Sequence, residues 1–198
     1  MNDKFYSLKK EKQDRMINGA MQVFAKKGYA LASTDEMVRV SNVSKGLWFH
    51  YFESKQGLYD FVASYSLKYA MLELMIKPTK PSADYLELRY EIEERKIRMV
   101  EKYPYLPLFL YSIVREDDPD VEETLRVPRQ RYAEQIAAFT MSADMSALKA
   151  HEDYLLILDM LEYTMDALLV DGYRAPVFSG ERYLSEVRRH IDALRALL

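Results

Sequence analysis

Residues 33–55, STDEMVRVSNVSKGLWFHYFESK, constrain the fold more than any other stretch of the chain. Three serines in this stretch occupy positions typical of helix N-caps: Ser33, Ser44 and Ser54. Ser33 and Glu36 fit a capping box, in which each side chain bonds the backbone N–H of the other residue. Asn42 is expected to end the first helix, because Asn tolerates a left-handed conformation. The spacing predicts two short helices and the start of a longer one, which is a helix-turn-helix arrangement that reads DNA.

The rest of the chain also shows helical spacing. No stretch alternates apolar and polar residues for long enough to indicate a strand, and the chain has only 6 glycines. We therefore predict an all-α protein of about nine helices. An N-terminal three-helix helix-turn-helix domain should cover residues 1–54, and a C-terminal helical ligand-binding and dimerisation domain residues 55–198. Besides the short helix that ends at Asn42, the expected helices are 8–27, 45–51, 55–77, 83–102, 106–115, 118–141, 147–170 and 181–198, with Pro128 kinking or interrupting one of them.

Charge is distributed unevenly along the chain. Residues 1–55 contain 10 Lys and Arg against 6 Asp and Glu, whereas residues 56–198 contain 18 against 25. A basic N-terminal quarter on an acidic body suits a protein of which one part approaches phosphate. Short acidic runs are expected to lie in solvent or at a helix N-terminus, among them Glu91, Glu93 and Glu94. The N-terminus has no signal-peptide pattern, and the longest apolar run is too short for a bilayer, so a cytoplasmic protein is expected.

No catalytic or metal site is expected. The chain has no cysteine, which excludes disulfides and thiolate metal sites. Three histidines lie on separate expected helices, and only His151 has adjacent carboxylates, Glu152 and Asp153. Residues one and two positions away do not share its helix face, so this is a poor metal or acid–base site. GxGxxG, P-loop and GxSxG patterns are all absent, and neither an enzyme nor a cofactor is expected.

The last two expected helices each carry a narrow apolar seam. The seam residues are spaced alternately by three and four positions, which is typical of helix–helix bundling. They are Tyr154, Leu158, Leu161, Met165 and Leu168, followed by Leu184, Val187, Ile191, Leu194 and Leu198. Two interpretations are open: the seams pack in the core of their own chain, or two helices from each of two chains form a four-helix dimer interface. A helix-turn-helix protein needs a dimer to span two half-sites, which favours the dimer.

Residues 15–62 resemble the DNA-binding domain of the TetR family of bacterial transcriptional repressors. The resemblance covers the apolar frame of the first helix with its Phe24-Ala25…Gly28-Tyr29 ending. It continues through the Val43-Ser44-Lys45-Gly46 turn, the His50-Tyr51-Phe52 run and the Ser54-Lys55 start. No motif after about residue 75 matches. The resemblance implies an all-α homodimer with an N-terminal DNA reader and a C-terminal domain that senses a ligand and dimerises.

The resemblance also implies which residues contact DNA. Thr34 and Lys55 fall where the family contacts phosphates, at the starts of the second and fourth helices, and such helix ends attract phosphate. The recognition helix and its leading turn contribute Ser44, Lys45, Gly46, Leu47, Phe49, His50 and Tyr51. Leu47 and Phe49 depart from the family pattern and leave only apolar base contacts, for example to a thymine methyl. Trp48 and Phe52 are expected to pack against neighbouring helices instead.

Aromatic and methionine side chains are frequent between residues 59 and 165. Core packing explains most of them, yet such side chains also line adaptable apolar pockets. The pocket candidates are Tyr65, Tyr69, Met99, Tyr103, Phe109, Tyr111, Tyr132 and Tyr163. The expected function is a ligand-responsive repressor that binds a near-palindromic operator as a dimer and is released by a small, mostly apolar effector. The alternative is a helical dimer that binds a protein partner or sequesters a lipophilic molecule.

Overall fold

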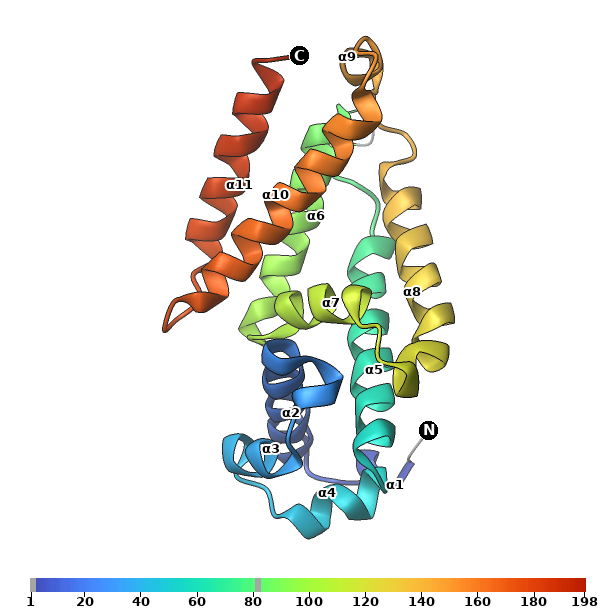
Figure 1. Ribbon diagram of the computed structural model, residues 1–198, viewed down its shortest axis with the longest axis vertical. Helices are drawn as coiled ribbons and strands as arrows, with labels where there is room; N and C mark the ends of the chain where they lie inside the picture. Colours follow the sequence, from blue (N-terminus) through green and yellow to red (C-terminus); the bar gives the residue numbers. More distant parts are fainter. Residues whose placement is uncertain (1–2, 81–82) are drawn as a thin grey trace. The chain divides into compact units, whose positions relative to one another are not determined.

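The computed structural model describes residues 3–80 and 83–198, and this part of the chain is helical (Figure 1). Within these two ranges, nine helices have eight residues or more, which confirms the predicted fold class. They are α2 (Lys10–Leu31), α3 (Thr34–Ser41), α4 (Lys45–Phe52), α5 (Lys55–Met75), α6 (Tyr85–Arg98), α7 (Leu106–Arg115), α8 (Pro119–Thr140), α10 (Tyr154–Arg174) and α11 (Gly180–Arg195). Three short elements complete the described chain: α1 (Asp3–Tyr6), the 3₁₀ helix η1 (Met99–Glu101) and α9 (Ser146–Lys149).

The chain divides into two compact units. The first contains residues up to Met71 together with Met99–Ala133, and the second contains Leu72–Arg98 with Glu134–Leu198. Both α5 and α8 contribute residues to each unit. The first unit therefore combines the helix-turn-helix with most of α5 and all of α7. The functional division at residue 54 stays a prediction.

Three residues with positive φ follow helical segments in the reader, the name used here for α2–α4, and one of them is Glu53, which follows α4 with φ 60°. Gly28 has φ 67° inside the stretch assigned to α2, and Asn42 follows α3 with φ 52° and ψ 45°. Gly28 and Asn42 were expected at these positions from their residue types, since a positive φ causes no steric clash for Gly and little for Asn. They set the directions in which the chain leaves the two helices.

The serine caps behave differently from one another. Ser54 accepts a hydrogen bond from the backbone N–H of Gly57 at 3.0 Å, as its cap position predicts. Within the described residues, Ser33 and Ser44 make no side-chain cap bond, so the predicted capping box is wrong. The Glu36 carboxylate instead pairs with Lys27, at 2.5 Å, and this hydrogen bond lowers the pKa of Glu36. An ion pair with the end of α2 has replaced the local bond.

Two other helix predictions differ from the structure. α8 continues across Pro128, so the proline does not interrupt it. The helix expected over 147–170 is two helices, because the chain turns between α9 and α10, where the N–H of His151 bonds the carbonyl of Leu148 at 3.0 Å. No proline or glycine marks that turn in the sequence.

The core of the first unit is apolar and aromatic. α2 packs against both α3 and α7. Gly19 permits the close approach of α2 and α3, since a Cβ at this position would lie 2.8 Å from the Cβ of Ser41. The Phe24 ring contacts the rings of Tyr59 and Phe109, with centroids 4.8 and 6.1 Å away. These contacts join the reader to α5 and α7 through side chains that are almost completely buried.

The core of the second unit contains charges. Glu93 on α6 is buried and receives hydrogen bonds from the Lys96 ammonium and the Tyr183 hydroxyl, each at 2.8 Å. Arg89, also buried, pairs with Glu162 on α10 at 2.7 Å. This network joins α6 to α10 and α11. The expectation that the acidic run would lie in solvent is wrong for Glu93, because two cations of α6 itself and a hydroxyl of α11 satisfy its carboxylate.

Candidate nucleic-acid interface

α3 and α4 form the helix-turn-helix, and burial separates the two faces of α4. Trp48 and Phe52 are 2% and 7% exposed, with ring centroids 6.1 Å apart, so they belong to the core as expected. Phe49 is 41% exposed, and Gly46 and His50 are also exposed. α4 is therefore anchored by one face and presents the other to solvent. That is the arrangement that a recognition helix needs to enter a major groove.

The predicted DNA contacts differ in exposure. Ser44, Lys45, Gly46, Phe49 and His50 are exposed, whereas Thr34, Leu47, Tyr51 and Lys55 are partly buried. The Lys45 ammonium pairs with Asp35 at 2.7 Å, and both side chains are more than half exposed. An exposed pair of this kind is weak and can open toward a phosphate. The five exposed residues thus lie in one helix and its leading turn.

Lys55 makes a contact that the sequence did not predict. Its ammonium donates hydrogen bonds to the carbonyls of Tyr29 and Ala30, at 3.0 and 3.2 Å, and lies 4.3 Å from the centroid of the Tyr29 ring. These carbonyls follow the left-handed Gly28, where the helical hydrogen bonds are interrupted. Lys55 therefore ties the start of α5 to the end of α2. Its role as a phosphate contact stays a prediction.

A second hydrogen bond holds Tyr29, this time from the segment between α7 and α8. The Tyr29 N–H donates to Oε2 of Glu116 at 2.7 Å, across 87 positions of sequence. Arg129 on α8 holds the segment that carries Glu116, by donating to the carbonyls of Ile113, at 2.8 Å, and of Glu116. Sequence reasoning missed Glu116 and Arg129, because no local spacing signals a bond between segments so far apart.

α5 also bonds to α8 directly. Asp60 accepts a hydrogen bond from the Thr124 hydroxyl at 2.7 Å, and Gln56 donates to the carbonyl of Asp120. Burial raises the pKa of Asp60, and the bond from Thr124 partly offsets this. The start of α5 is thus held both by the reader and by α8.

Comparisons with known proteins agree with this geometry. The sequence profile described as "Bacterial regulatory proteins, tetR family" matches residues 16–62, which span most of α2 through the first residues of α5. Residues 16–62 form a DNA-binding domain of the TetR family of transcriptional regulators. Membership of this family means that the chain is not an enzyme. Residues 33–55, which carried the sequence argument, lie entirely within the matched range.

Relatives extend the likeness beyond the reader. The "Biofilm operon icaADBC HTH-type negative transcriptional regulator IcaR" of Staphylococcus aureus is 23% identical over 88% of this chain and 94% of its own length. A TetR family transcriptional regulator from Chloroflexus aurantiacus has the same fold, with a TM-score of 0.61, 19% identity and coverage of 97% of this chain and 95% of its own. The TetR family regulator PfmR from Thermus thermophilus matches with a TM-score of 0.56, 19% identity and coverage of 91% and 96%.

The structure brings three of the eight ligand candidates of this TetR-family chain together. The hydroxyls of Tyr65 and Tyr103 are hydrogen-bonded, and the Tyr69 ring lies 5.2 Å from that of Tyr103. Lys102 lies over both the Tyr69 and the Tyr103 ring, 5.6 and 5.2 Å from their centroids. Burial, followed by the hydrogen bond to Tyr65, raises the pKa of Tyr103. This cluster combines aromatic faces with a nearby cation.

The other five candidates are dispersed. Phe109 is in the aromatic core of the first unit, Met99 and Tyr132 are buried, and Tyr111 lies against the guanidinium of Arg115. Tyr163, on α10, is 70% exposed. None of the eight lines the cavities found beside α10 and α11. Their role in ligand binding stays a prediction.

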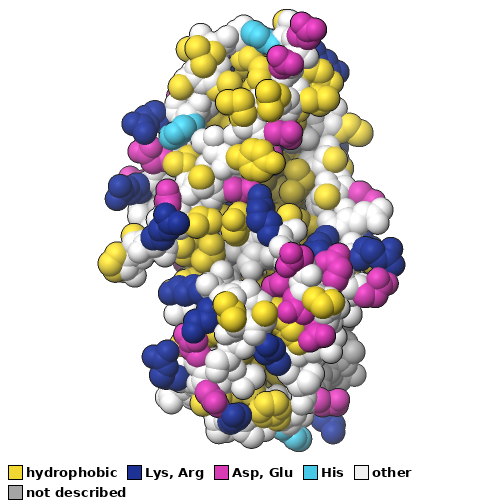
Figure 2. Space-filling model, in the orientation of Figure 1, with side chains coloured by type: hydrophobic (Ala, Val, Ile, Leu, Met, Phe, Trp, Pro, Cys, Tyr) yellow, Lys and Arg dark blue, Asp and Glu magenta, His cyan; other side chains and the backbone are white. Residues whose placement is uncertain are grey.

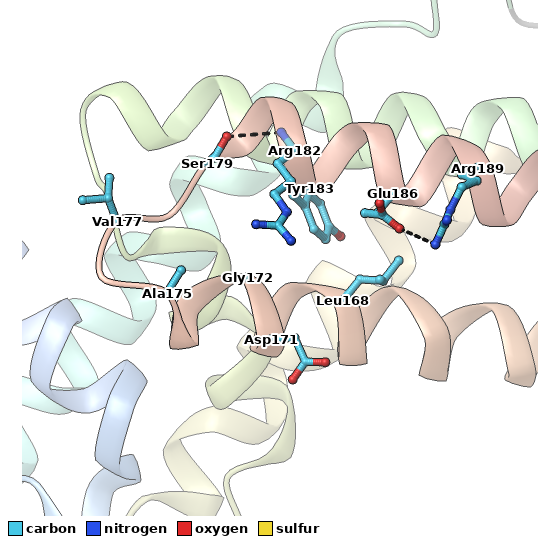
Figure 3. A pocket seen from close by; sticks show the side chains of 10 residues that line it. All are labelled: Leu168, Asp171, Gly172, Ala175, Val177, Ser179, Arg182, Tyr183, Glu186 and Arg189. Carbon is cyan, nitrogen blue, oxygen red and sulfur yellow. Dashed lines mark hydrogen bonds and ion pairs between the residues drawn. The ribbon is translucent and has the colours of Figure 1, made fainter.

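The largest described cavity, about 470 Å³, lies between the end of α10 and the start of α11 (Figure 3). Leu168, Val177 and the Tyr183 ring give it apolar walls, and Arg182 reaches into the space between the helices. A second cavity of about 280 Å³ lies at the other end of this helix pair. Its lining includes His151, His190 and the apolar side chains of Ile157, Met160, Leu161, Leu194 and Leu197.

The predicted dimer seams are buried only in part within their own chain, and their role in a dimer stays a prediction. Leu161, Met165, Val187 and Ile191 are buried, and the other six seam residues are partly buried: Tyr154, Leu158, Leu168, Leu184, Leu194 and Leu198. The strongly exposed apolar residues of α10 lie in other positions, and we call them the α10 stripe: Leu155, Leu156, Met160 and Tyr163, which are 58–70% exposed. Figure 2 shows hydrophobic side chains gathered over the surface of α10 and α11.

Neither a metal site nor a membrane span is found in residues 3–80 and 83–198. No group of three or more His, Cys, Asp or Glu in these ranges is placed to hold a metal ion. No helix among them combines the length and apolar character needed to cross a bilayer.

Proposed function

We propose that this TetR-family regulator is a repressor that binds a near-palindromic operator as a homodimer. The observation that carries the proposal is the division of α4 into a buried face, with Trp48 and Phe52, and an exposed face, with Phe49 and His50. The relative from Staphylococcus aureus is named as a negative regulator, and the likeness covers 94% of its length, which supports repression. A dimer would place two copies of α4 in successive major grooves.

The dimer is best supplied by α10 and α11. The α10 stripe is contiguous on one helix face, since Leu156, Met160 and Tyr163 follow each other by four and three positions. Large exposed apolar patches mark interaction sites. We infer that a second copy covers the stripe together with the exposed Leu197, which follows α11, and that the partly buried seam residues lie beneath them.

A small, mostly apolar effector would act by changing the position of α5. Such an effector shifts DNA affinity only if it binds the two arrangements of the dimer unequally. The contacts of Lys55 and Glu116 with Tyr29 support this route, because they connect the end of α2 to α5 and to the α7–α8 turn. Movement of α5 or of the α7–α8 turn would change the contacts that support the end of α2 in the reader.

The proposal is tested by selecting duplexes from a random-sequence pool with the full chain. We expect enrichment of near-palindromic duplexes with two half-sites about one helical turn apart, since the dimer reads two grooves. Lys45→Ala should weaken binding of the enriched duplex and reduce the salt slope of log K by about one for each bound protomer. Lys68→Ala, an exposed lysine further along α5, is the matched control. Failure to enrich any duplex would favour the alternative, a helical dimer that binds a protein or a lipophilic molecule.

A further inference from the structure

The amino-terminal segment, residues 4–9, packs against the recognition helix. Phe5 is 0% exposed. Its ring contacts Phe52 and Phe61 at centroid distances of 5.2 and 5.1 Å and the Tyr51 ring at 5.9 Å. Phe5 thus fills a space between α4 and α5. A completely buried aromatic side chain fixes the backbone position of the residues next to it in the chain.

A buried glutamine holds the rest of the segment. The side-chain amide of Gln13, only 7% exposed, donates to the carbonyls of Tyr6 and Leu8, at 3.1 and 2.8 Å. The Ser7 hydroxyl donates to the carbonyl of Lys4 at 2.6 Å. These bonds satisfy backbone groups that a mobile arm would leave to water. The segment is therefore packed and hydrogen-bonded within the first unit, and it has a defined position beside α4.

Two lysines of the segment face solvent beside this contact. Lys4 and Lys9 are exposed. The next lysine, Lys10, is already paired with Asp14 at 2.8 Å, and this bond raises the pKa of Lys10. Lys4 precedes the residue that touches Tyr51, and the rings of Tyr51 and His50 are 4.8 Å apart. Lys4 is consequently a neighbour of the exposed end of α4, and Lys9 lies at the other end of the same segment.

The location of these lysines suits phosphate rather than base contacts. A recognition helix in a major groove about 12 Å wide has a sugar–phosphate backbone on either side of it. A segment that packs against the flank of that helix lies over one of these backbones. Contacts to phosphate fix the register of a protein on the duplex and add affinity without sequence preference.

We propose that the amino-terminal segment is part of the DNA interface, with Lys4 and Lys9 contacting phosphates beside the groove that α4 occupies. Phe5 is a positioning residue, which sets the location of the lysines and of Tyr51. The proposal rests on the proposed function, since it requires operator binding through α4. It adds to the interface a segment that precedes the helix-turn-helix and lies outside residues 16–62, the range of the family match.

The lysines are tested with the double variant Lys4→Ala/Lys9→Ala on the duplex that the unaltered chain enriches from a random pool. We expect binding at least about tenfold weaker at 150 mM KCl, for all enriched sequences alike, and a salt slope reduced by about two for each bound protomer. Lys68→Ala/Arg131→Ala removes the same charge from exposed positions elsewhere in the first unit and should leave the slope unchanged. Both lysines are exposed, so the fold is retained.

The outcomes separate the two proposals. If the unaltered chain enriches no duplex, the proposed function fails. If it does, and the double variant binds with an unchanged slope, the inference about the segment is overturned while the proposed function stands. If the control variant reduces the slope equally, the effect is one of net charge, and the inference is also overturned.

The role of Phe5 needs its own variant. Phe5→Ala should reproduce the reduced salt slope, because the lysines lose their position, and adding the lysine changes should reduce the slope little further. Phe5→Leu should retain most of the binding, because an apolar side chain still fills the space. If Phe5→Ala weakens binding with the slope of the unaltered chain, Phe5 only stabilises the first unit and is not a positioning residue.

Discussion

The reader and the α10–α11 pair are both helical, but they differ in how completely their apolar side chains are buried. In the reader, Trp48, Phe52 and Met37 are buried within the chain. On α10, the stripe that includes Met160 and Tyr163 remains exposed. A recognition helix must be rigid before it meets DNA, so its support belongs to its own chain. The helix pair, in contrast, leaves part of its apolar surface exposed to solvent.

The two regions also differ in what their cores contain. The core around α2 is aromatic and aliphatic, whereas α6 contains the buried charges of Arg89, Glu93 and Arg95. Arg89 and Glu93 bond to α10 and α11, and Arg95 bonds to carbonyls at the end of α5. Buried ion pairs contribute little net stability but are costly to break. We therefore expect the reader to respond to changes of side-chain volume and the second unit to changes of charge and pH.

The largest effect is expected in the core of the reader. Trp48→Ala should lower the free energy of unfolding by about 3–5 kcal/mol, because a buried indole is replaced by a cavity. The measurement is urea denaturation followed by circular dichroism. Phe49→Ala, at the neighbouring but 41% exposed position, should change stability by less than about 0.5 kcal/mol. Equal effects at the two positions would contradict the division of α4 into a buried and an exposed face.

Charges placed on the α10 stripe should affect assembly and leave the fold intact. The variant Met160→Asp/Tyr163→Asp is expected to weaken self-association by about 100-fold, equivalent to about 2.7 kcal/mol, since two unpaired carboxylates would enter an apolar interface. Sedimentation equilibrium over a range of concentrations measures this. Val177→Asp, which is 81% exposed in the turn before α11, serves as the control. Association that is unaffected by the stripe variant would place the dimer interface elsewhere.

Glu93 should make the second unit sensitive to acid. Burial raises the pKa of its carboxyl, but Lys96, Arg89 and Tyr183 together lower the pKa below the ordinary value. A carboxylate with a lowered pKa stabilises the fold above its unfolded pKa, about 4.3, and the stabilisation is lost as pH falls through the folded value.

Glu93→Gln should therefore cost about 2 kcal/mol at pH 7, where the hydrogen bonds to the charged group are weakened. The loss relative to the unaltered chain should shrink as pH falls below about 4.3. Thermal unfolding between pH 7 and pH 3 measures both. A loss that is the same at every pH would show that packing alone accounts for the effect.

Glu116 tests whether the α7–α8 turn holds the reader. Glu116→Ala should cost about 1.5 kcal/mol, because the Tyr29 N–H loses a charged acceptor. Hydrogen exchange at the Tyr29 amide should accelerate. Exchange at the start of α5, next to Lys55, should change less. Glu122→Ala, which removes an exposed partner of Arg129 from the same region, is the control. Unchanged exchange at Tyr29 would remove Glu116 from the connection.

The smallest effect separates a real cap from an apparent one. Ser54→Ala should cost about 1 kcal/mol, because the Gly57 N–H loses its acceptor. Ser33→Ala should cost far less, because Ser33 makes no side-chain cap bond. Paired thermal melts measure the difference. Similar losses for the two variants would indicate that the Ser33 cap forms in solution.

Much of the fold was accessible from the sequence, and the reason is local. Gly28 and Asn42 end helices through their own conformational preferences, and Ser54 caps α5 through a bond to a residue three positions away. The helix predicted over 106–115 coincides with α7. Helical spacing in these segments depends on residues within a turn or two of one another, so it can be read along the chain.

The candidate site was only partly accessible, for reasons that are equally physical. The heptad spacing of α10 identified a helix that packs on its neighbours, but a helix can satisfy one seam in its own core and present another outward. Leu161 and Met165 pack inside, and Met160 and Tyr163 lie outside. Spacing alone does not say which face meets which partner. Similarly, no local pattern around Phe5 signals a partner, and its contact with Tyr51 depends on the return of the chain after 46 positions.

The sequence by itself determined that residues 33–55 form a helix-turn-helix and that the chain is all-α, because caps, left-handed turn residues and helical periods act over a few positions. The tertiary structure alone decided that Glu36 bonds Lys27 instead of Ser33. It also decided that Lys55 and Glu116 meet at Tyr29, and that Glu93 is buried with its partners. These are pairings between distant segments, and many partners of equal chemistry compete for each of them until packing brings one into reach.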